Sequence, residues 1–168
     1  METLDDFRKM NSEILLQGEV QAFLTREAEL LDERRFEEWV KLFDNDGIYW
    51  VPSSPTQEDM HGQVSLILED KSLLNLRIKR LSHPNAHAYN PPPSSVHLVG
   101  NVSADTDEEF VIAKSKLIVT EFRNDSETSL SGKVTHTLKR ATGGFRIKLK
   151  RIDLIQAGGT FSAITVPL

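Results

Sequence analysis

The chain contains no cysteine among its 168 residues. Disulfide bonds, thiolate nucleophiles, zinc–thiolate sites and cysteine-ligated iron–sulfur clusters are therefore excluded for this polypeptide. It also has no apolar run near the roughly 20 residues that a membrane-spanning helix needs. Residues 1–9 are acidic and do not have the basic and apolar pattern of a secretory leader. We therefore expect a soluble cytoplasmic protein.

Strong charge of either sign is lacking as well. The formal net charge is −5, and no separate block of lysine and arginine stands out, which argues against a nucleic-acid or anionic-membrane partner. The sequence has no internal repeat, no low-complexity run and no linker that would divide it. We expect one domain over residues 1–168, with residues 1–10 as a flexible tail.

Apolar residues recur at steps of three and four in two neighbouring stretches, which is typical of amphipathic helices. The two stripes are Val20, Phe23, Leu24, Ala28 and Leu31, and then Phe36, Trp39, Val40 and Phe43. The charged residues 32–35 separate them. We expect residues 44–47 to end the second helix in a tight turn, and residues 48–51 to form a strand that Pro52 closes.

The second half of the chain is dominated by strand patterns. Asp70 is placed to cap a helix that runs to about Leu81, and the proline-rich residues 83–95 form a stiff arm. Strands are then expected at the residue ranges 96–102, 110–122, 130–139 and 145–154. Helices followed by long antiparallel strands indicate the α+β class.

The apolar phase changes within the last of these strands. Up to residue 149 the odd-numbered residues are apolar and Lys150 falls on the outer face, whereas Ile152 and Leu154 continue the apolar face afterwards. Such a change predicts a bulge or sharp bend near Lys150 and Arg151, which would curl the sheet.

Histidines, carboxylates and tyrosines are the residues from which a reactive site would have to be built. His83 and His87 have a four-residue spacing that would pair them on a helix, but Pro84 makes that helix improbable on steric grounds. We expect an ordinary loop there and no metal site.

His136 lies on the apolar face of its predicted strand. In a catalytic interpretation, the acid and base of a cavity would be drawn from His136, Tyr49 and Asp46. His97 would be a further candidate for this role. A single histidine among core residues is more often a hydrogen-bonded structural residue, so we expect no catalytic residue in this chain. His97 is interpreted as structural or interfacial. Tyr49 and Trp50 point to opposite faces of their strand, which makes one of them a candidate for a subunit surface.

Residues 27–52 (EAELLDERRFEEWVKLFDNDGIYWVP) resemble the opening block of the β, or small, subunit of aromatic ring-hydroxylating dioxygenases. The resemblance continues through residues 65–81, 91–102 and 144–156, in order along most of the chain. It implies a cone-shaped, strongly curved mixed or antiparallel sheet wrapped around N-terminal helices, as in nuclear transport factor two and scytalone dehydratase.

The resemblance also implies a function. Such subunits are structural and non-catalytic, form a homotrimer, and scaffold an α3β3 hexamer for the breakdown of aromatic compounds. The α subunit of the holoenzyme would carry the Rieske 2Fe–2S cluster and the mononuclear iron, and this chain no cofactor. Two alternatives stay open: a stand-alone cone-fold dehydratase or isomerase acting on a small aromatic or polyketide-like compound, and a binding or assembly module without chemistry.

Overall fold

The structure is a computed structural model that describes residues 4–83, 90–160 and 163–168. The helices and strands within these ranges are α1 (Leu4–Asp32), α2 (Phe36–Val40), β1 (Phe43–Val51), β2 (Ile67–Asp70), α3 (Lys71–Leu81), β3 (Ser94–Asp107), β4 (Phe110–Arg123), β5 (Ser126–Ala141) and β6 (Gly144–Leu154). None of the helices in these ranges has the length and apolar character needed to cross a membrane.

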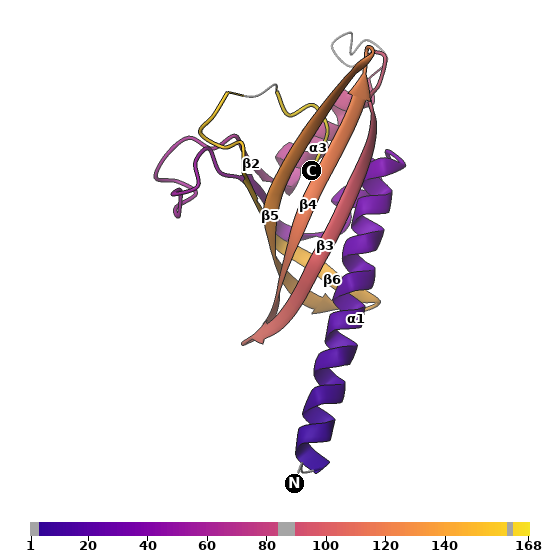
Figure 1. Cartoon of the computed structure of the whole chain (residues 1–168), viewed down its shortest axis with the longest axis vertical. Helices are drawn as coiled ribbons and strands as arrows, with labels where there is room; N and C mark the ends of the chain where they lie inside the picture. Colours follow the sequence, from indigo (N-terminus) through magenta and orange to yellow (C-terminus); the bar gives the residue numbers. More distant parts are fainter. Residues whose placement is uncertain (1–3, 84–89, 161–162) are drawn as a thin grey trace.

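The strands form one curved sheet in the order β2-β1-β6-β5-β4-β3. The contact between β1 and β6 is parallel, and the other contacts are antiparallel, so the sheet is mixed. Figure 1 shows α1 running alongside the sheet and projecting well beyond it at the N-terminal end. The predicted α+β class is confirmed, with the helices and the long antiparallel strands in the expected order.

The first predicted helix is part of α1, which is longer than expected. Val20, Leu24 and Leu31 of the predicted stripe are buried, and residues 4–10 form the first turns of this helix where a tail was expected. The charged break is present, because α1 ends at Asp32 and α2 begins at Phe36.

The prediction of a tight turn at residues 44–47 is wrong. These residues belong to β1, where the pairing with β6 jumps from Phe43 opposite Ile147 to Ile48 opposite Leu149. The extra residues form an irregularity in the strand. A Cβ atom on Gly47 would lie 2.5 Å from the carbonyl oxygen of Ile147, so the close approach of the two strands requires glycine there.

The predicted change of phase in β6 is confirmed, but the bulge lies earlier than expected. Leu138 pairs with Ile147 and Thr137 pairs with Leu149, so Lys148 is the extra residue. The bulge therefore precedes Lys150 and turns its side chain inward, where it is buried. The prediction that Lys150 lies on the outer face is wrong for this reason.

The other strand and helix predictions agree with the structure. Asp70 caps α3 by accepting a hydrogen bond from the backbone N–H of Leu73 at 2.9 Å, and the even-numbered residues 130–138 of β5 are buried as predicted. Of the proposed histidine pair, His87 lies outside the described residues.

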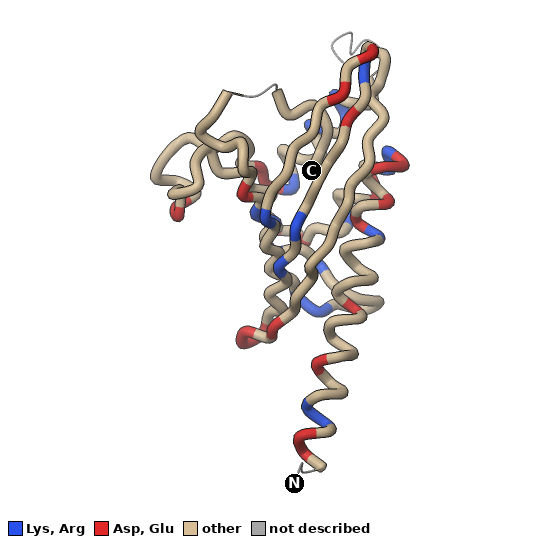
Figure 2. The backbone as a smooth tube through the Cα atoms, in the orientation of Figure 1, with Lys and Arg blue, Asp and Glu red and all other residues tan. Residues whose placement is uncertain are grey.

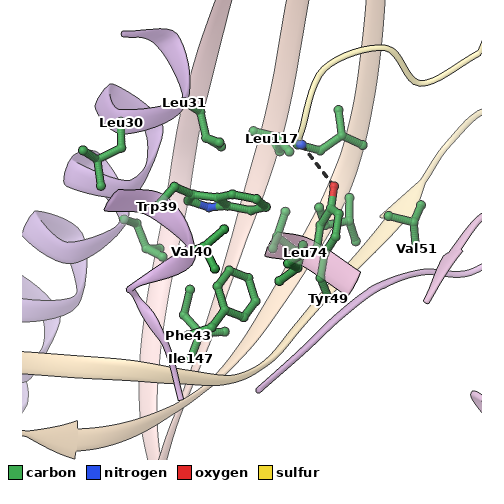
Figure 3. Packing of buried hydrophobic residues seen from close by; sticks show 14 of the residues in the cluster. Leu30, Leu31, Trp39, Val40, Phe43, Tyr49, Val51, Leu74, Leu117 and Ile147 are labelled. Atoms are coloured by element: carbon green, nitrogen blue, oxygen red, sulfur yellow. Dashed lines mark hydrogen bonds between the residues drawn. The ribbon is translucent and has the colours of Figure 1, made fainter. Parts of the chain in front are cut away.

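Trp39 lies at the centre of the core, as predicted. Its ring makes edge contacts with Phe43 and Tyr49, at centroid distances of 5.3 and 5.6 Å. Figure 3 shows this group between the helices and the strands, with Leu31 above the indole. Together with Phe36 and Val40, which are also buried, Trp39 holds α2 against the core.

Trp50 is also buried, so neither Tyr49 nor Trp50 is exposed and the expectation of a surface aromatic is wrong. The segment between β1 and β2 covers Trp50, whose indole N–H donates to Ser65 Oγ at 2.9 Å. The guanidinium of Arg151 lies 4.4 Å from the Trp50 ring centroid on the same side. The outer face of β1 is thus covered by the chain's own loop.

Trp39→Ala should lower the free energy of unfolding by about 3 to 5 kcal/mol, because it leaves a cavity in a closely packed region and removes a hydrogen bond. Trp39→Phe, which keeps an aromatic ring, should cost less. Thermal or urea unfolding measures both. An alanine variant as stable as the wild type would contradict the assigned packing.

Candidate functional site

Three buried ionisable side chains meet inside the fold: Glu27 from α1, His136 from β5 and Lys150 from β6. Glu27 Oε1 accepts hydrogen bonds from Lys150 Nζ at 2.7 Å and from Trp39 Nε1 at 3.0 Å. Glu27 Oε2 lies 2.9 Å from His136 Nε2. We call these four side chains the Glu27 cluster. It joins two helices and two strands through one carboxylate.

The Glu27 carboxylate is ionised in this setting. Burial by itself would raise the pKa of Glu27, but the charges and hydrogen bonds of Lys150 and His136 outweigh it and hold the pKa well below its ordinary value of 4.5. An ionised carboxylate can only accept hydrogen bonds, so His136 Nε2 must carry its proton and donate. Both carboxylate oxygens are occupied, and the charge is balanced within the cluster.

Sequence reasoning had identified His136 and Trp39 but had missed Glu27 and Lys150. A signal for Glu27 was present, because residue 27 lies on the apolar stripe of α1, between Leu24 and Leu31. A carboxylate at such a position predicts a buried partner. Lys150 could not be assigned to the core without knowing the exact site of the bulge.

The residues of the catalytic interpretation do not all share one site, because Asp46 is exposed whereas Tyr49 and His136 are buried. Tyr49 and His136 are 0% and 2% exposed, and the Tyr49 hydroxyl accepts a hydrogen bond from the backbone N–H of Leu168 at 3.1 Å (Figure 3). Burial raises the pKa of Tyr49 above its ordinary value of 10.0. Asp46 lies at the surface in an ion pair with Lys148. The hydrogen bond that Lys148 donates to Asp46 lowers the pKa of Asp46.

His97 has a separate structural role. Its Nδ1 lies 2.6 Å from Asp32 Oδ1 and its Nε2 lies 2.9 Å from the carbonyl oxygen of Pro167. The backbone N–H of His97 also donates to Asp32. His97 therefore connects the end of α1 to β3 and to residues 163–168, whose Val166 and Leu168 are buried.

Metal ligands are not assembled in the part of the chain that the structure describes. Residues 4–83, 90–160 and 163–168 contain no group of three or more His, Asp or Glu side chains placed to hold an ion. The chain also has no cysteine with which to ligate an iron–sulfur cluster.

An apolar patch lies on the outer face of β3 and β4. It consists of Val96, Leu98, Ile118 and Phe122, which are 64, 62, 44 and 52% exposed. Leu98 pairs directly with Ile118 across the two strands, so the four side chains share one face. A contiguous apolar patch of this kind is typical of a surface that another protein covers.

Comparison with solved structures defines the fold. A chain of naphthalene 1,2-dioxygenase, solved with indole in the active site, superposes with a TM-score of 0.83 at 18% identity, covering 99% of this chain and 95% of that one. An NTF2-like protein with a cystatin-like fold from Novosphingobium aromaticivorans superposes with a TM-score of 0.64 at 16% identity, covering 97% and 96%. The fold is therefore the predicted cone fold.

Sequence comparison defines the family. The family model described as "Ring hydroxylating beta subunit" matches residues 26–158. The small subunit of 2-halobenzoate 1,2-dioxygenase from Burkholderia cepacia is 30% identical over 142 residues, which cover 81% of this chain and 86% of that one. This chain belongs to the β subunits of aromatic ring-hydroxylating dioxygenases, as the opening block had indicated.

Glu27→Gln should destabilise the protein by about 3 to 5 kcal/mol near neutral pH, because it leaves the buried Lys150 ammonium without its countercharge. Because folding lowers the pKa of Glu27 from 4.5, the wild-type carboxylate stabilises the fold above that pH. This contribution is lost as the pH falls below about 4.5 toward the folded-state pKa.

Urea unfolding of wild type and variant from neutral to acid pH measures this effect. The difference between the two proteins should shrink as the pH falls through the acid range. A constant difference at every pH would show that the charge of Glu27 does not stabilise the fold.

Proposed function

We propose that this chain is the structural, non-catalytic β subunit of a Rieske-type aromatic ring-hydroxylating dioxygenase, and that it assembles in the cytoplasm as a homotrimer bearing α subunits in an α3β3 hexamer. Family membership supplies the class of enzyme. The observation that supports a scaffolding role is the Glu27 cluster, in which the interior histidine is hydrogen bonded to a buried, charge-balanced carboxylate.

The surface supports assembly in a second way. The apolar patch on β3 and β4 would be an unfavourable surface for an isolated chain, and burying it against another subunit would remove apolar area from water at about 25 cal/mol per Å². The patch includes Leu98 and Ile118, which are exposed although they lie in long and well-paired strands. A subunit that acts by forming interfaces needs such surfaces.

The redox chemistry is assigned to the partner. A Rieske 2Fe–2S cluster and a mononuclear iron on the α subunit would activate dioxygen and hold the aromatic substrate. The residues of this chain would contribute position and stability: they would fix the arrangement of the α subunits and take no part in electron transfer.

The alternative is a stand-alone dehydratase or isomerase of the same fold, with His136 as the base. The geometry gives it less support, since His136 and Tyr49 are almost fully buried and the Tyr49 hydroxyl already bonds to a backbone N–H. A general base must reach the proton that it removes.

Protein purified alone should be colourless, free of stoichiometric iron and inactive toward arenes, and it should sediment as a trimer. Co-expression with a Rieske α subunit should convert the trimer into a hexamer. Analytical ultracentrifugation with metal analysis measures both properties. A chain that stays monomeric and binds no α subunit, or one that holds iron by itself, would contradict the proposal.

A further inference from the structure

The turn between β5 and β6 lies against the middle of α1 and leaves a pocket of about 540 Å³ between them. Three arginines line this pocket, Arg26 from α1 and Arg140 and Arg146 from the two strands, together with one carboxylate, Glu19. A local excess of positive charge is unusual in a chain whose formal net charge is −5. We call this site the arginine pocket.

The positive charge of the arginine pocket is only weakly neutralised from within the chain. Arg140 donates to Glu19 at 3.0 Å, but both side chains are more than half exposed, and such a surface pair contributes little. Arg26 lies 3.9 Å from Glu29 and 3.8 Å from Glu38, again in largely exposed pairs. Arg146 donates to the backbone carbonyl of Phe145 at 3.0 Å. A guanidinium has five N–H donors, so donors remain for a bound carboxylate.

The apolar part of the pocket holds one of the arginines in place. The rings of Phe23 and Phe145 meet edge to face at a centroid distance of 5.7 Å. The guanidinium of Arg140 lies 5.2 Å from the Phe145 ring centroid, which restricts its orientation. Arginine is among the residues enriched at the energetic hot spots of protein–protein interfaces.

A matching acidic surface exists on the same chain. The hairpin between β3 and β4 carries Asp105, Asp107, Glu108 and Glu109, all exposed, and Figure 2 shows its tip in red at the lower left. Within the described residues, none of these four carboxylates forms an ion pair with a lysine or arginine. Four like charges in five residues repel one another and favour a cationic partner.

The hairpin and the arginine pocket lie at the same end of the sheet. Phe110, at the base of the hairpin, pairs with Lys139, the residue before Arg140. The two surfaces are thus neighbours within one chain. A rotation of one copy about an axis near this end can bring its hairpin to the arginine pocket of the next copy.

We propose that the arginine pocket receives the acidic β3–β4 hairpin of a second copy of this chain. The contact is heterologous, because a different surface is used on each side, and repetition of such a contact can close a ring. The inference rests on the proposed function, since it assigns the contact between the β subunits of the trimer.

Charge reversal tests the contact. Arg140→Glu with Arg146→Glu, and separately Asp107→Lys with Glu108→Lys, should each weaken self-association at least roughly tenfold, because like charges then face each other. A chain that carries all four changes should regain association, since the signs are complementary again. Lys79→Glu, on the exposed face of α3, is the matched control and should associate like the wild type.

Disulfide trapping tests the same contact without reversing the pocket charges, and the lack of native cysteine makes it specific. A chain with Glu108→Cys is mixed with a tagged chain that carries Ala141→Cys at the pocket wall. Oxidation should give a mixed disulfide between the two chains. The pair Glu108→Cys and Lys79→Cys should not cross-link above background.

The outcomes separate the two proposals. Suppose that the wild type is a trimer, that the charge-reversed variants associate as tightly as the wild type, and that the mixed cysteine pair does not cross-link above the control. This result would overturn the assigned contact but would leave the scaffolding function standing. A wild-type chain that is monomeric at every concentration would overturn the trimer and the contact together. Restored association in the four-change chain, with the selective cross-link, supports the inference.

Discussion

The hydrogen-bonded ionic contact between Glu27 and its partners is the interaction on which the rest of the structure depends. A buried carboxylate is tolerated only when it is paired and hydrogen bonded, and Glu27 meets this requirement with Lys150, His136 and Trp39. These partners come from β6, β5 and α2. The position of α1 is thereby fixed against both the sheet and the second helix, and displacing α1 or β6 would break the Glu27–Lys150 ion pair.

The same contact supports the proposal that the interior stabilises the fold. A cone fold can enclose a cavity with an acid and a base, but here the ionisable groups bind one another and the Tyr49 hydroxyl bonds to the backbone at Leu168. The surface has the opposite character, with the exposed apolar patch, the arginine pocket and the acidic hairpin. These surface features support the proposed role in assembly.

Local sequence patterns predicted much of this fold. The apolar stripe of α1, the Asp70 cap and the alternation in β5 depend on spacing and on single side chains, and they appear where predicted. The irregular β1 segment and the burial of Trp50 could not be read in this way. The first depends on how closely β6 approaches Gly47, and the second depends on a loop that folds back over the strand.

Only part of the Glu27 cluster could be predicted from the sequence, because the position of Lys150 depends on the strand register. His136 follows from strand alternation, but the inward turn of Lys150 depends on a bulge whose position shifted by two residues from the expected one. A one-residue change of register moves a side chain to the other face of a sheet. Long-range ion pairs are therefore visible in a sequence only when each strand register is already known.

The central claim is that the interior of this subunit stabilises and does not catalyse. The most direct test is the turnover of the holoenzyme containing His136→Gln, normalised to the amount of assembled complex. The account predicts less stable protein and fewer complexes, with turnover per complex nearly unchanged. A fall of ~10²-fold or more in turnover per assembled complex, the loss expected for a general base, would contradict it.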